Sequence, residues 1–229
     1  MQNIKTVCAI IVAAGSSSRM SKGNKMFMDV LSKPCLVHTL EAFQNSSVVD
    51  GIIVVTKNEY IEDVKKLCEQ YGIDKLAVVT EGGTSRAASV LCGVASAKDY
   101  DIILIHDGAR PLVSQKLILD VANCAAEYGA AIPCIAVKDT IKVVENGFVL
   151  TTPNRSTLYA VQTPQGFSRL LYEKVADSYD GDFATLTDDS MLFEAAEYRV
   201  KTIDGEYENI KITTDSDVAV AEKYLGERK

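Results

Sequence analysis

The chain has 229 residues, of which 47% are hydrophobic and 24% charged, an ordinary globular composition that excludes extensive disorder. Its 24 basic and 31 acidic residues give a formal net charge of −7, which argues against duplex nucleic acid and anionic membrane surfaces as partners. Apolar runs such as residues 7–14 are far shorter than the roughly 20 residues that a membrane-spanning helix needs. The first residues also lack the pattern of a signal peptide, so we expect a cytoplasmic protein.

Short β-branched runs alternate with amphipathic stretches in the first half of the chain. The runs predict buried strands at residues 7–12, 52–55, 76–80, 102–106 and 130–134. The amphipathic stretches predict helices at residues 34–45, 59–71, 84–96 and 114–128, the second of them capped by Asn58. This order is typical of right-handed βαβ crossovers. We therefore predict an α/β fold with a mostly parallel sheet and helices on both faces.

Residues 138–157 interrupt the alternation. Two apolar segments, 140–144 and 148–152, flank Glu145-Asn146-Gly147, and Asn-Gly is the strongest short signal for a β-hairpin because both residues tolerate positive φ. A lone hairpin is marginal in water, so we expect this arm to pack on the parent domain or on a second copy. Beyond it the pattern predicts helices at 168–178, 187–196 and 215–225, and strands at 199–203 and 208–212. No linker appears, so residues 1–229 are predicted to form one domain with an arm.

Six cysteines and two histidines offer no Cys-x-x-Cys pair, so we do not expect a zinc site. Cys8, Cys92 and Cys134 lie in apolar runs, where a cysteine is typically a small buried hydrophobe in a reducing compartment. His38 and His106 are interpreted as packed, hydrogen-bonded side chains, because the sequence has no nucleophile elbow that would complete a catalytic triad.

Ligands of such sheets bind beyond the carboxyl ends of the strands, where three glycine-containing loops follow predicted strands. The first loop begins Ala13-Ala14-Gly15 and carries Arg19 and Lys25. Small residues allow close approach of the backbone, and successive N–H groups can bind an anion. The loop lacks the P-loop and dinucleotide fingerprints. It predicts a phosphate site, with a flexible surface loop as the alternative.

The second loop, residues 81–86, reads EGGTSR and is followed by Ser89. Its glycine pair and the free N–H groups of the following helix suit a phosphate or nucleotide, and an ordinary β-to-α turn is the alternative. The third, residues 106–111, reads HDGARP. Asp107 at a strand end suits a magnesium ligand, but it also suits a helix cap or an ion pair with Arg110. Farther on, Asp188-Asp189 is interpreted as the acidic start of a helix rather than a metal site.

Taken together, the motifs resemble those of the methylerythritol phosphate cytidylyltransferases of the non-mevalonate isoprenoid pathway. The first loop, AAGSSSRM, marks only the wider class of sugar-nucleotide transferases. The more specific motifs are HDGARP, VKDT (137–140), TPNR (152–155), QTPQGF (162–167) and NIKITTDSD (209–217). The resemblance runs from about residue 6 to residue 225 and implies a Rossmann-like nucleotidyltransferase fold.

The resemblance also implies a reaction in which a sugar phosphate attacks the α-phosphorus of CTP and pyrophosphate leaves. The attacking group is already an oxyanion, so catalysis needs alignment and cations rather than a strong base. CTP is the co-substrate, magnesium the metal, and the other substrate a small alditol phosphate. The hairpin resembles the family's dimerisation arm, which implies a homodimer with Thr140 and Arg155 at a site shared between subunits.

By their positions in the family motifs, Arg19 and Lys25 are expected to stabilise the transition state, and Arg155 and Lys211 to position the sugar phosphate. The expected nucleotide contacts are Ala13, Ala14, Gly15, Gly83, Thr84, Arg86, Ser89 and Asp107, with Asp107 also near the metal. The expected substrate contacts are Asp107, Arg110, Asp139, Thr140, Arg155, Thr163 and Lys211.

Three positions depart from the family pattern. Asn24-Lys25-Met26 stands where Pro-Lys-Gln is common, Tyr159 where tryptophan is frequent, and Ala87 where glutamine is common. None removes a catalytic charge, so we expect an active enzyme. The alternatives are a ribitol phosphate cytidylyltransferase, whose relatives tend to have a bulkier residue at Ala109, and a non-catalytic nucleotide-binding subunit. A nicotinamide dehydrogenase is remote, because Gly-x-Gly-x-x-Gly is absent.

Overall fold

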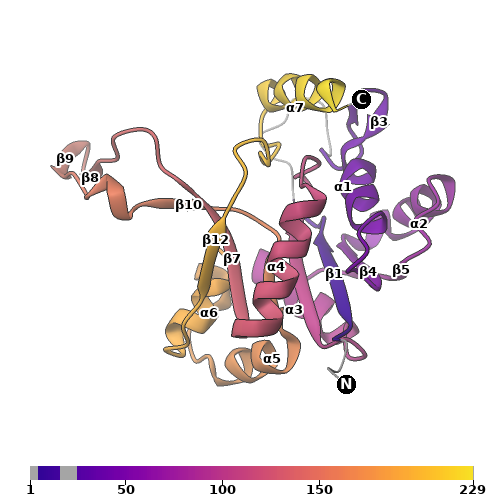
Figure 1. The fold of residues 1–229 in the computed structure, drawn as a ribbon, viewed down its shortest axis with the longest axis horizontal. Coiled ribbons are helices and arrows are strands. Elements are labelled where there is room, and N and C mark those ends of the chain that lie inside the picture. The colour runs from indigo at the N-terminus through magenta and orange to yellow at the C-terminus, as the bar shows by residue number, and fades with distance from the viewer. Residues whose placement is uncertain (1–4, 16–24, 229) are drawn as a thin grey trace.

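The structure is a computed structural model that describes residues 5–15 and 25–228. At its centre is an eight-stranded sheet in the order β10-β7-β11-β6-β1-β4-β5, with β12 paired to β7 (Figure 1). The strands are β1 (Val7–Val12), β4 (Gly51–Thr56), β5 (Leu76–Glu81), β6 (Ile102–Asp107), β7 (Ala130–Ala136), β10 (Tyr159–Val161), β11 (Gln165–Ser168) and β12 (Lys201–Asp204). Strands β1, β4, β5 and β6 pair in parallel, whereas β10 and β11 run antiparallel to their neighbours. The predicted α/β fold with a mostly parallel sheet is confirmed.

Helices cover both faces of this sheet, as predicted. They are α1 (Cys35–Gln44), α2 (Ile61–Gln70), α3 (Arg86–Ser96), α4 (Gln115–Tyr128), α5 (Arg169–Ser178), α6 (Ser190–Ala195) and α7 (Asp215–Glu227). Alternate residues of a strand point to opposite faces, so β1 contributes to two cores. Ala9 and Ile11 pack with α1, α2, α4 and α7, whereas Cys8 and Ile10 pack with α3, α5 and α6. Because β1 is buried on both sides, it fixes the position of residues 13–15, which follow it directly.

Serine side chains cap the two helices that follow β5 and β6. The Ser85 hydroxyl accepts a hydrogen bond from the Ala88 N–H at 3.1 Å, and the Ser114 hydroxyl accepts one from the Leu117 N–H at 3.0 Å. Helix α4 ends at Gly129, whose φ of 84° suits glycine. The start of α3 is therefore held in place directly beside the second predicted loop.

Residues 208–212 do not form the predicted strand. The segment crosses the carboxyl end of the sheet and hydrogen-bonds to loops instead of to a strand. The Ile212 N–H donates to the Ala109 carbonyl at 2.8 Å, and the Asn209 side-chain amide donates to the Thr163 carbonyl at 2.8 Å. The sequence pattern favours extended backbone here, but the hydrogen-bond partner is the loop after β6. This arrangement brings Lys211 to the edge of the sheet where ligands are expected.

Other boundaries also differ from the prediction. The predicted cap at Asn58 is wrong, because Asn58–Tyr60 forms a 3-10 turn and α2 begins at Ile61 without a side-chain cap. Helix α6 begins at Ser190, so Asp189 is its N-cap residue, but the Asp189 carboxylate does not bond to the helix backbone. Strands β10 and β11 are absent from the prediction, because β10 has only three residues and the QGFS sequence of β11 shows no strand pattern.

The predicted hairpin consists of β8 (Val143–Glu145) and β9 (Phe148–Thr151), which pair only with each other in the described chain. Its turn places Asn146 and Gly147 at φ values of 51° and 84°, as an Asn-Gly turn requires. Figure 1 shows the hairpin at the tip of a long extension far from the sheet. A second small hairpin, β2 (Asp29–Val30) with β3 (Lys33–Pro34), precedes α1.

Four of the six cysteines (Cys8, Cys35, Cys68 and Cys134) are buried, while Cys92 and Cys124 are half-buried. Cys92 is therefore less buried than its apolar run suggests. Within the described residues, no helix combines the length and the apolar character that crossing a membrane would require.

Candidate active site

A cavity of about 520 Å³ lies at the carboxyl ends of β1, β5 and β6. Residues from all three predicted loops line it, together with the segment that precedes α7. They include Ala14, Gly15, Lys25, Gly82, Gly83, Thr84, Arg86, Ser89, Asp107, Lys211 and Thr213. Ala13 lies just behind this surface, where its N–H donates to the Val55 carbonyl at 2.7 Å. We call this space the first cavity.

Two glycines let the second loop pass close to its neighbours. A Cβ atom on Gly82 would lie 2.7 Å from the Ser89 hydroxyl and 2.9 Å from the Ala14 Cβ. A Cβ atom on Gly83 would lie 2.5 Å from the Ala88 Cβ. Any side chain at either position would displace the loop, so these glycines shape the wall of the first cavity. The Ser89 hydroxyl is itself fixed, because it donates to the Ser85 carbonyl at 2.8 Å.

Three cations surround the carboxylate of Asp107, and we call these four residues the Asp107 cluster. The Lys211 Nζ lies 3.0 Å from Oδ2, the Arg110 Nε 3.4 Å from Oδ2, and the Arg86 Nε 3.6 Å from Oδ1. Burial would raise the pKa of Asp107, but Lys211, Arg86 and Arg110 outweigh it and hold the pKa well below its ordinary value. The cluster therefore carries one negative and three positive charges, a net excess of positive charge at the cavity wall.

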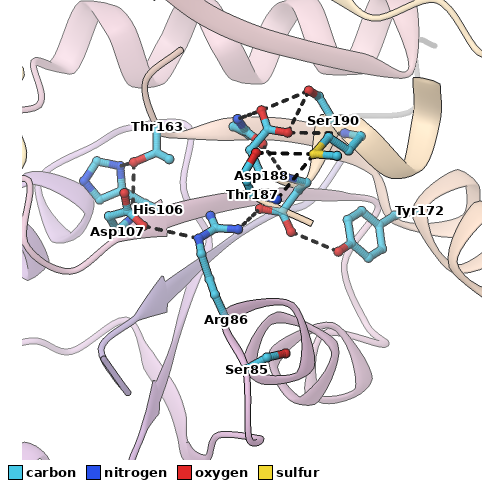
Figure 2. A network of polar contacts seen from close by, with 12 residues as sticks. Ser85, Arg86, His106, Asp107, Thr163, Tyr172, Thr187, Asp188 and Ser190 are labelled. Carbon is cyan, nitrogen blue, oxygen red and sulfur yellow. Dashed lines mark hydrogen bonds and ion pairs between the residues drawn. The ribbon is translucent and has the colours of Figure 1, made fainter. Parts of the chain in front are cut away.

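His106 contacts two groups that hold this cluster in place, the Thr163 hydroxyl and the Arg110 carbonyl. Its side chain is fully buried, with Nδ1 3.1 Å from the Thr163 hydroxyl and Nε2 3.2 Å from the Arg110 carbonyl. The Thr163 oxygen also accepts the Asp107 N–H at 3.1 Å (Figure 2). Burial lowers the pKa of His106 to about 3, so the ring is neutral and accepts a hydrogen bond at Nδ1 while donating from Nε2. This matches the prediction of a packed, hydrogen-bonded histidine, as does the contact of His38 with the Val30 carbonyl at 2.8 Å.

A second cavity, of about 360 Å³, adjoins the first. It shares Arg86, Asp107 and Lys211 with the first cavity. Its other lining residues include Arg110, Val161, Thr163, Gln165, Asp188 and Ser190. The Asp107 cluster therefore stands between two neighbouring spaces, and its cations can reach an anion in either one.

The remaining predicted residues differ in where they lie. Lys25 lines the first cavity, and its Nζ donates to the Ile212 carbonyl at 3.1 Å. Arg19 lies outside the described residues. Asp139, Thr140 and Arg155 belong to the arm and line neither cavity, and the Arg155 guanidinium donates to the Lys138 carbonyl at 2.9 Å.

Sequence reasoning missed a carboxylate that belongs to this site. Asp189 forms an ion pair with Arg86, with 2.8 Å between Oδ2 and Nη1, and only 2% of Asp189 is exposed. Its other oxygen accepts the Tyr172 hydroxyl at 3.1 Å. The sequence shows only an acidic pair before a helix, and a partner 103 residues away leaves no local signal.

The described residues that line the first cavity include a single carboxylate, Asp107. Within the described parts of the chain, no group of three or more His, Cys, Asp or Glu residues is placed to hold a metal ion. Magnesium is usually bound by one or two carboxylates together with substrate phosphates. The donor set therefore fits a magnesium ion that is held mainly by a nucleotide, and it does not fit a metal bound by protein groups alone.

Comparisons with known proteins identify the family of the chain. The family model described as 2-C-methyl-D-erythritol 4-phosphate cytidylyltransferase matches residues 7–227. A protein of that name from Alkaliphilus oremlandii is 41% identical over 236 residues, covering 100% of this chain and 99% of the relative.

Solved structures give the same result. The crystal structure of 4-diphosphocytidyl-2C-methyl-D-erythritol synthase from Anaerococcus prevotii matches with a TM-score of 0.86 and 33% identity, over 98% of this chain and 100% of that one. The 2-C-methyl-D-erythritol 4-phosphate cytidylyltransferase from Thermus thermophilus matches with a TM-score of 0.75 and 30% identity, over 95% and 98% of the two chains. The chain therefore belongs to the 2-C-methyl-D-erythritol 4-phosphate cytidylyltransferase family.

Proposed function

We infer that the two cavities form the active site of a cytidylyltransferase that converts CTP and 2-C-methyl-D-erythritol 4-phosphate into 4-diphosphocytidyl-2-C-methyl-D-erythritol and pyrophosphate. The observation that carries this inference is the Asp107 cluster between two adjoining cavities, in a chain of this family. A phosphate oxygen of the sugar phosphate attacks the α-phosphorus of CTP in line with the leaving pyrophosphate. The new bond joins that oxygen to the α-phosphorus, and the bond from the α-phosphorus to the bridging oxygen breaks.

In this proposal CTP occupies the first cavity. The backbone of residues 13–15 faces the triphosphate, and the residues on the α3 side face the base and ribose, namely Gly83, Thr84, Arg86 and Ser89. Lys25, together with Arg19, stabilises the negative charge that gathers at the α-phosphorus. Positioned cations contribute most where charge develops in the transition state, and the attacking phosphate needs no base because it is already ionised.

The sugar phosphate occupies the second cavity. Arg110 and Thr163 line this space, and Lys211 borders both cavities. A cation on the shared wall can therefore hold the phosphate of one substrate beside the phosphates of the other. Alignment of two bound reactants contributes to the rate without any proton having to move.

We propose a homodimer formed through the arm of a single nucleotidyltransferase domain. The arm exposes large apolar side chains: Phe148 is 79% exposed, Leu150 65% and Val149 61%. A hairpin of this length is marginal in water by itself, and exposed apolar surface of this kind typically marks an interface. A second copy that covers the arm would bring Asp139, Thr140 and Arg155 to the partner's substrate cavity.

Magnesium is proposed as the metal, with Asp107 as its protein ligand and nucleotide phosphates as the other ligands. When bound, the ion would neutralise charge on the phosphates. Chelation with EDTA is expected to abolish pyrophosphate release, and added magnesium should restore it. Full activity in the presence of the chelator would show that the metal assignment is wrong.

We also propose that the enzyme works in the reducing environment of the cytoplasm. All six cysteines are free thiols, and four are buried, which is typical of proteins that are never exposed to oxidising conditions. Subcellular fractionation of the source cells, followed by detection of the protein, would test this location.

A direct assay tests the reaction. The protein is incubated with CTP, magnesium and one alditol phosphate, and pyrophosphate release is followed. Faster turnover of ribitol 5-phosphate than of methylerythritol phosphate would overturn the substrate assignment. Binding of CTP without any pyrophosphate release would instead identify a non-catalytic nucleotide-binding subunit.

A further inference from the structure

Arg86 lies between two carboxylates that come from different parts of the fold. Its Nε faces Asp107 on β6 at 3.6 Å, and its Nη1 faces Asp189, which precedes α6, at 2.8 Å. Figure 2 shows the guanidinium extended across the space between His106 and Asp107 on one side and Tyr172 on the other. Burial would lower the pKa of Arg86, but Asp189 and Asp107 outweigh it and keep the pKa above its ordinary value. Arg86 is therefore a permanent cation with two competing partners.

Asp189 is the more deeply buried of these partners. It is 2% exposed, its Oδ1 accepts the Tyr172 hydroxyl at 3.1 Å, and its N–H donates to the Gln165 side chain at 3.0 Å. Tyr172 is 1% exposed and packs edge-on against Phe167 at 5.4 Å. The Gln165 amide in turn donates to Asp188 at 2.9 Å. The Asp189 carboxylate is thus held by Tyr172 and its backbone by Gln165, which restricts how far it can follow Arg86 if the arginine moves.

The ion pair with Asp189 limits how Arg86 can bind Asp107. A guanidinium can bind a carboxylate through two parallel N–H donors, and this geometry is stronger than a single contact. Nη1 is engaged by Asp189, and the Arg86 Nε lies 3.6 Å from Asp107, beyond hydrogen-bonding distance. Without Asp189, Arg86 could turn fully onto Asp107 and compete with Lys211 and Arg110 for it. The guanidinium would then leave its place between the two cavities.

We propose that Asp189, oriented by Tyr172, is a positioning residue that holds Arg86 at the wall between the two cavities and keeps it from closing onto Asp107. This proposal rests on the proposed function, because it assigns Arg86 to the nucleotide cavity. Asp189 does not line either cavity in the described residues, so it acts only through Arg86. Asp189 adds a second carboxylate to the electrostatics of the site without contacting a substrate.

The test compares Asp189→Asn with wild type in steady-state kinetics. Asparagine keeps the shape and the acceptor for Tyr172 but removes the charge that holds Arg86. We expect the KM for CTP to rise about tenfold or more, in the range of a lost hydrogen bond to a charged group, with a smaller change in kcat. Asp177→Asn, an exposed site on the same helix as Tyr172, is the matched control and should leave both constants unchanged.

A purely structural role would give a different result, which a double-mutant cycle detects. Arg86→Gln and Asp189→Asn are measured singly and together. If Asp189 acts through Arg86, the double variant matches Arg86→Gln, and the second substitution adds no further loss in kcat/KM. Independent, additive losses, or an unchanged KM for CTP in Asp189→Asn, would overturn the proposal.

Tyr172→Phe provides the second variant in case Asp189→Asn does not fold. Phenylalanine keeps the ring packed against Phe167 and removes only the hydroxyl that donates to Asp189. We expect a smaller rise in the KM for CTP, roughly threefold, in the same direction. No rise would contradict the proposal. If wild type itself releases no pyrophosphate from CTP and the sugar phosphate, the proposed function fails and not the positioning role alone.

Discussion

The Asp107 cluster is positioned entirely by contacts within one chain, whereas the predicted site residues on the arm line neither cavity of that chain. All members of the cluster come from one chain: Asp107 is 8% exposed, and three cations of the same chain lie within 3.6 Å of it. The arm carries Arg155 and Thr140 on an extension whose apolar side chains are exposed. A parallel sheet brings distant residues together at its edge without help from a partner. Residues on a lone hairpin are positioned only by what covers the hairpin, so the two regions should respond differently to mutation.

Lys25→Ala should have the largest effect, because it removes a cation from the wall of the first cavity. We expect kcat to fall by ~10²–10³, as for the loss of one transition-state donor, with only a modest change in CTP binding. The measurement is pyrophosphate release at saturating substrates. Lys65→Ala, an exposed lysine on α2 paired with Glu62, is the control. Near-normal turnover in Lys25→Ala would show that the lysine does not face the reacting phosphate.

Phe148→Asp tests whether a second copy covers the arm. Phe148 is 79% exposed in one subunit, and burying a phenylalanine contributes roughly 2 kcal/mol. A charge in its place should raise the dimer dissociation constant by about 10²-fold or more, because each subunit contributes one arm. Analytical ultracentrifugation measures the effect. Leu170→Asp on α5, 67% exposed, is the matched control, and equal weakening by both variants would argue against an interface at the arm.

Arg155→Ala should raise the KM for the sugar phosphate roughly tenfold, and the KM for CTP much less, because it removes one hydrogen bond to a charged group. Its position in the dimer can be tested by mixing. If each arm serves the partner's site, a mixed dimer of Arg155→Ala and Lys25→Ala subunits has one intact site. With sugar phosphate well below its KM, random mixing should then restore roughly a quarter of the wild-type rate. No recovery would place Arg155 in the site of its own chain.

The same contrast explains what could be predicted from sequence. Strands such as β1 and β6 are buried on both faces, so their apolar runs mark them clearly, and the rule for parallel sheets then locates the three loops. The hairpin follows from Asn146-Gly147, because the turn conformation is a local property. These features depend on neighbours in the chain or on a general rule of sheet topology.

Features that depend on contacts between residues far apart in the sequence leave no local sequence pattern. Strand β11 contains Gly166, where a Cβ would lie 2.7 Å from the Val121 side chain, so α4 packs against the strand at a distance that a larger residue would not allow. The extended segment around Lys211 pairs with a loop where the pattern predicts a strand. The ion pair between Arg86 and Asp189 joins residues 103 positions apart. The sequence pattern identifies charged residues such as Arg86, but only the fold shows that Asp189 is its second carboxylate partner.

The pH dependence of stability also separates the two regions. The pKa of His106 is lowered to about 3 by burial, against an ordinary value of 6.5 in the unfolded chain, so the unfolded state binds more protons between these values. Stability therefore falls as pH decreases through this window, by about 2 kcal/mol between pH 6 and 4.5. Asp107 acts in the same direction only at lower pH, because its pKa is held below its ordinary value of 3.8.

Urea unfolding at pH 6, 5 and 4.5, with a chelator present, measures this dependence. His106→Gln should lose about 2 kcal/mol of the change between pH 6 and 4.5, because glutamine does not titrate. Any packing effect of the substitution is the same at both pH values and cancels in the difference. Arg155→Ala on the arm should retain the wild-type slope, since the arm contains no buried titratable group among its described residues. An equal slope in wild type and His106→Gln would mean that the ring is protonated in the folded protein, and the neutral hydrogen-bonded support of Asp107 would have to be abandoned.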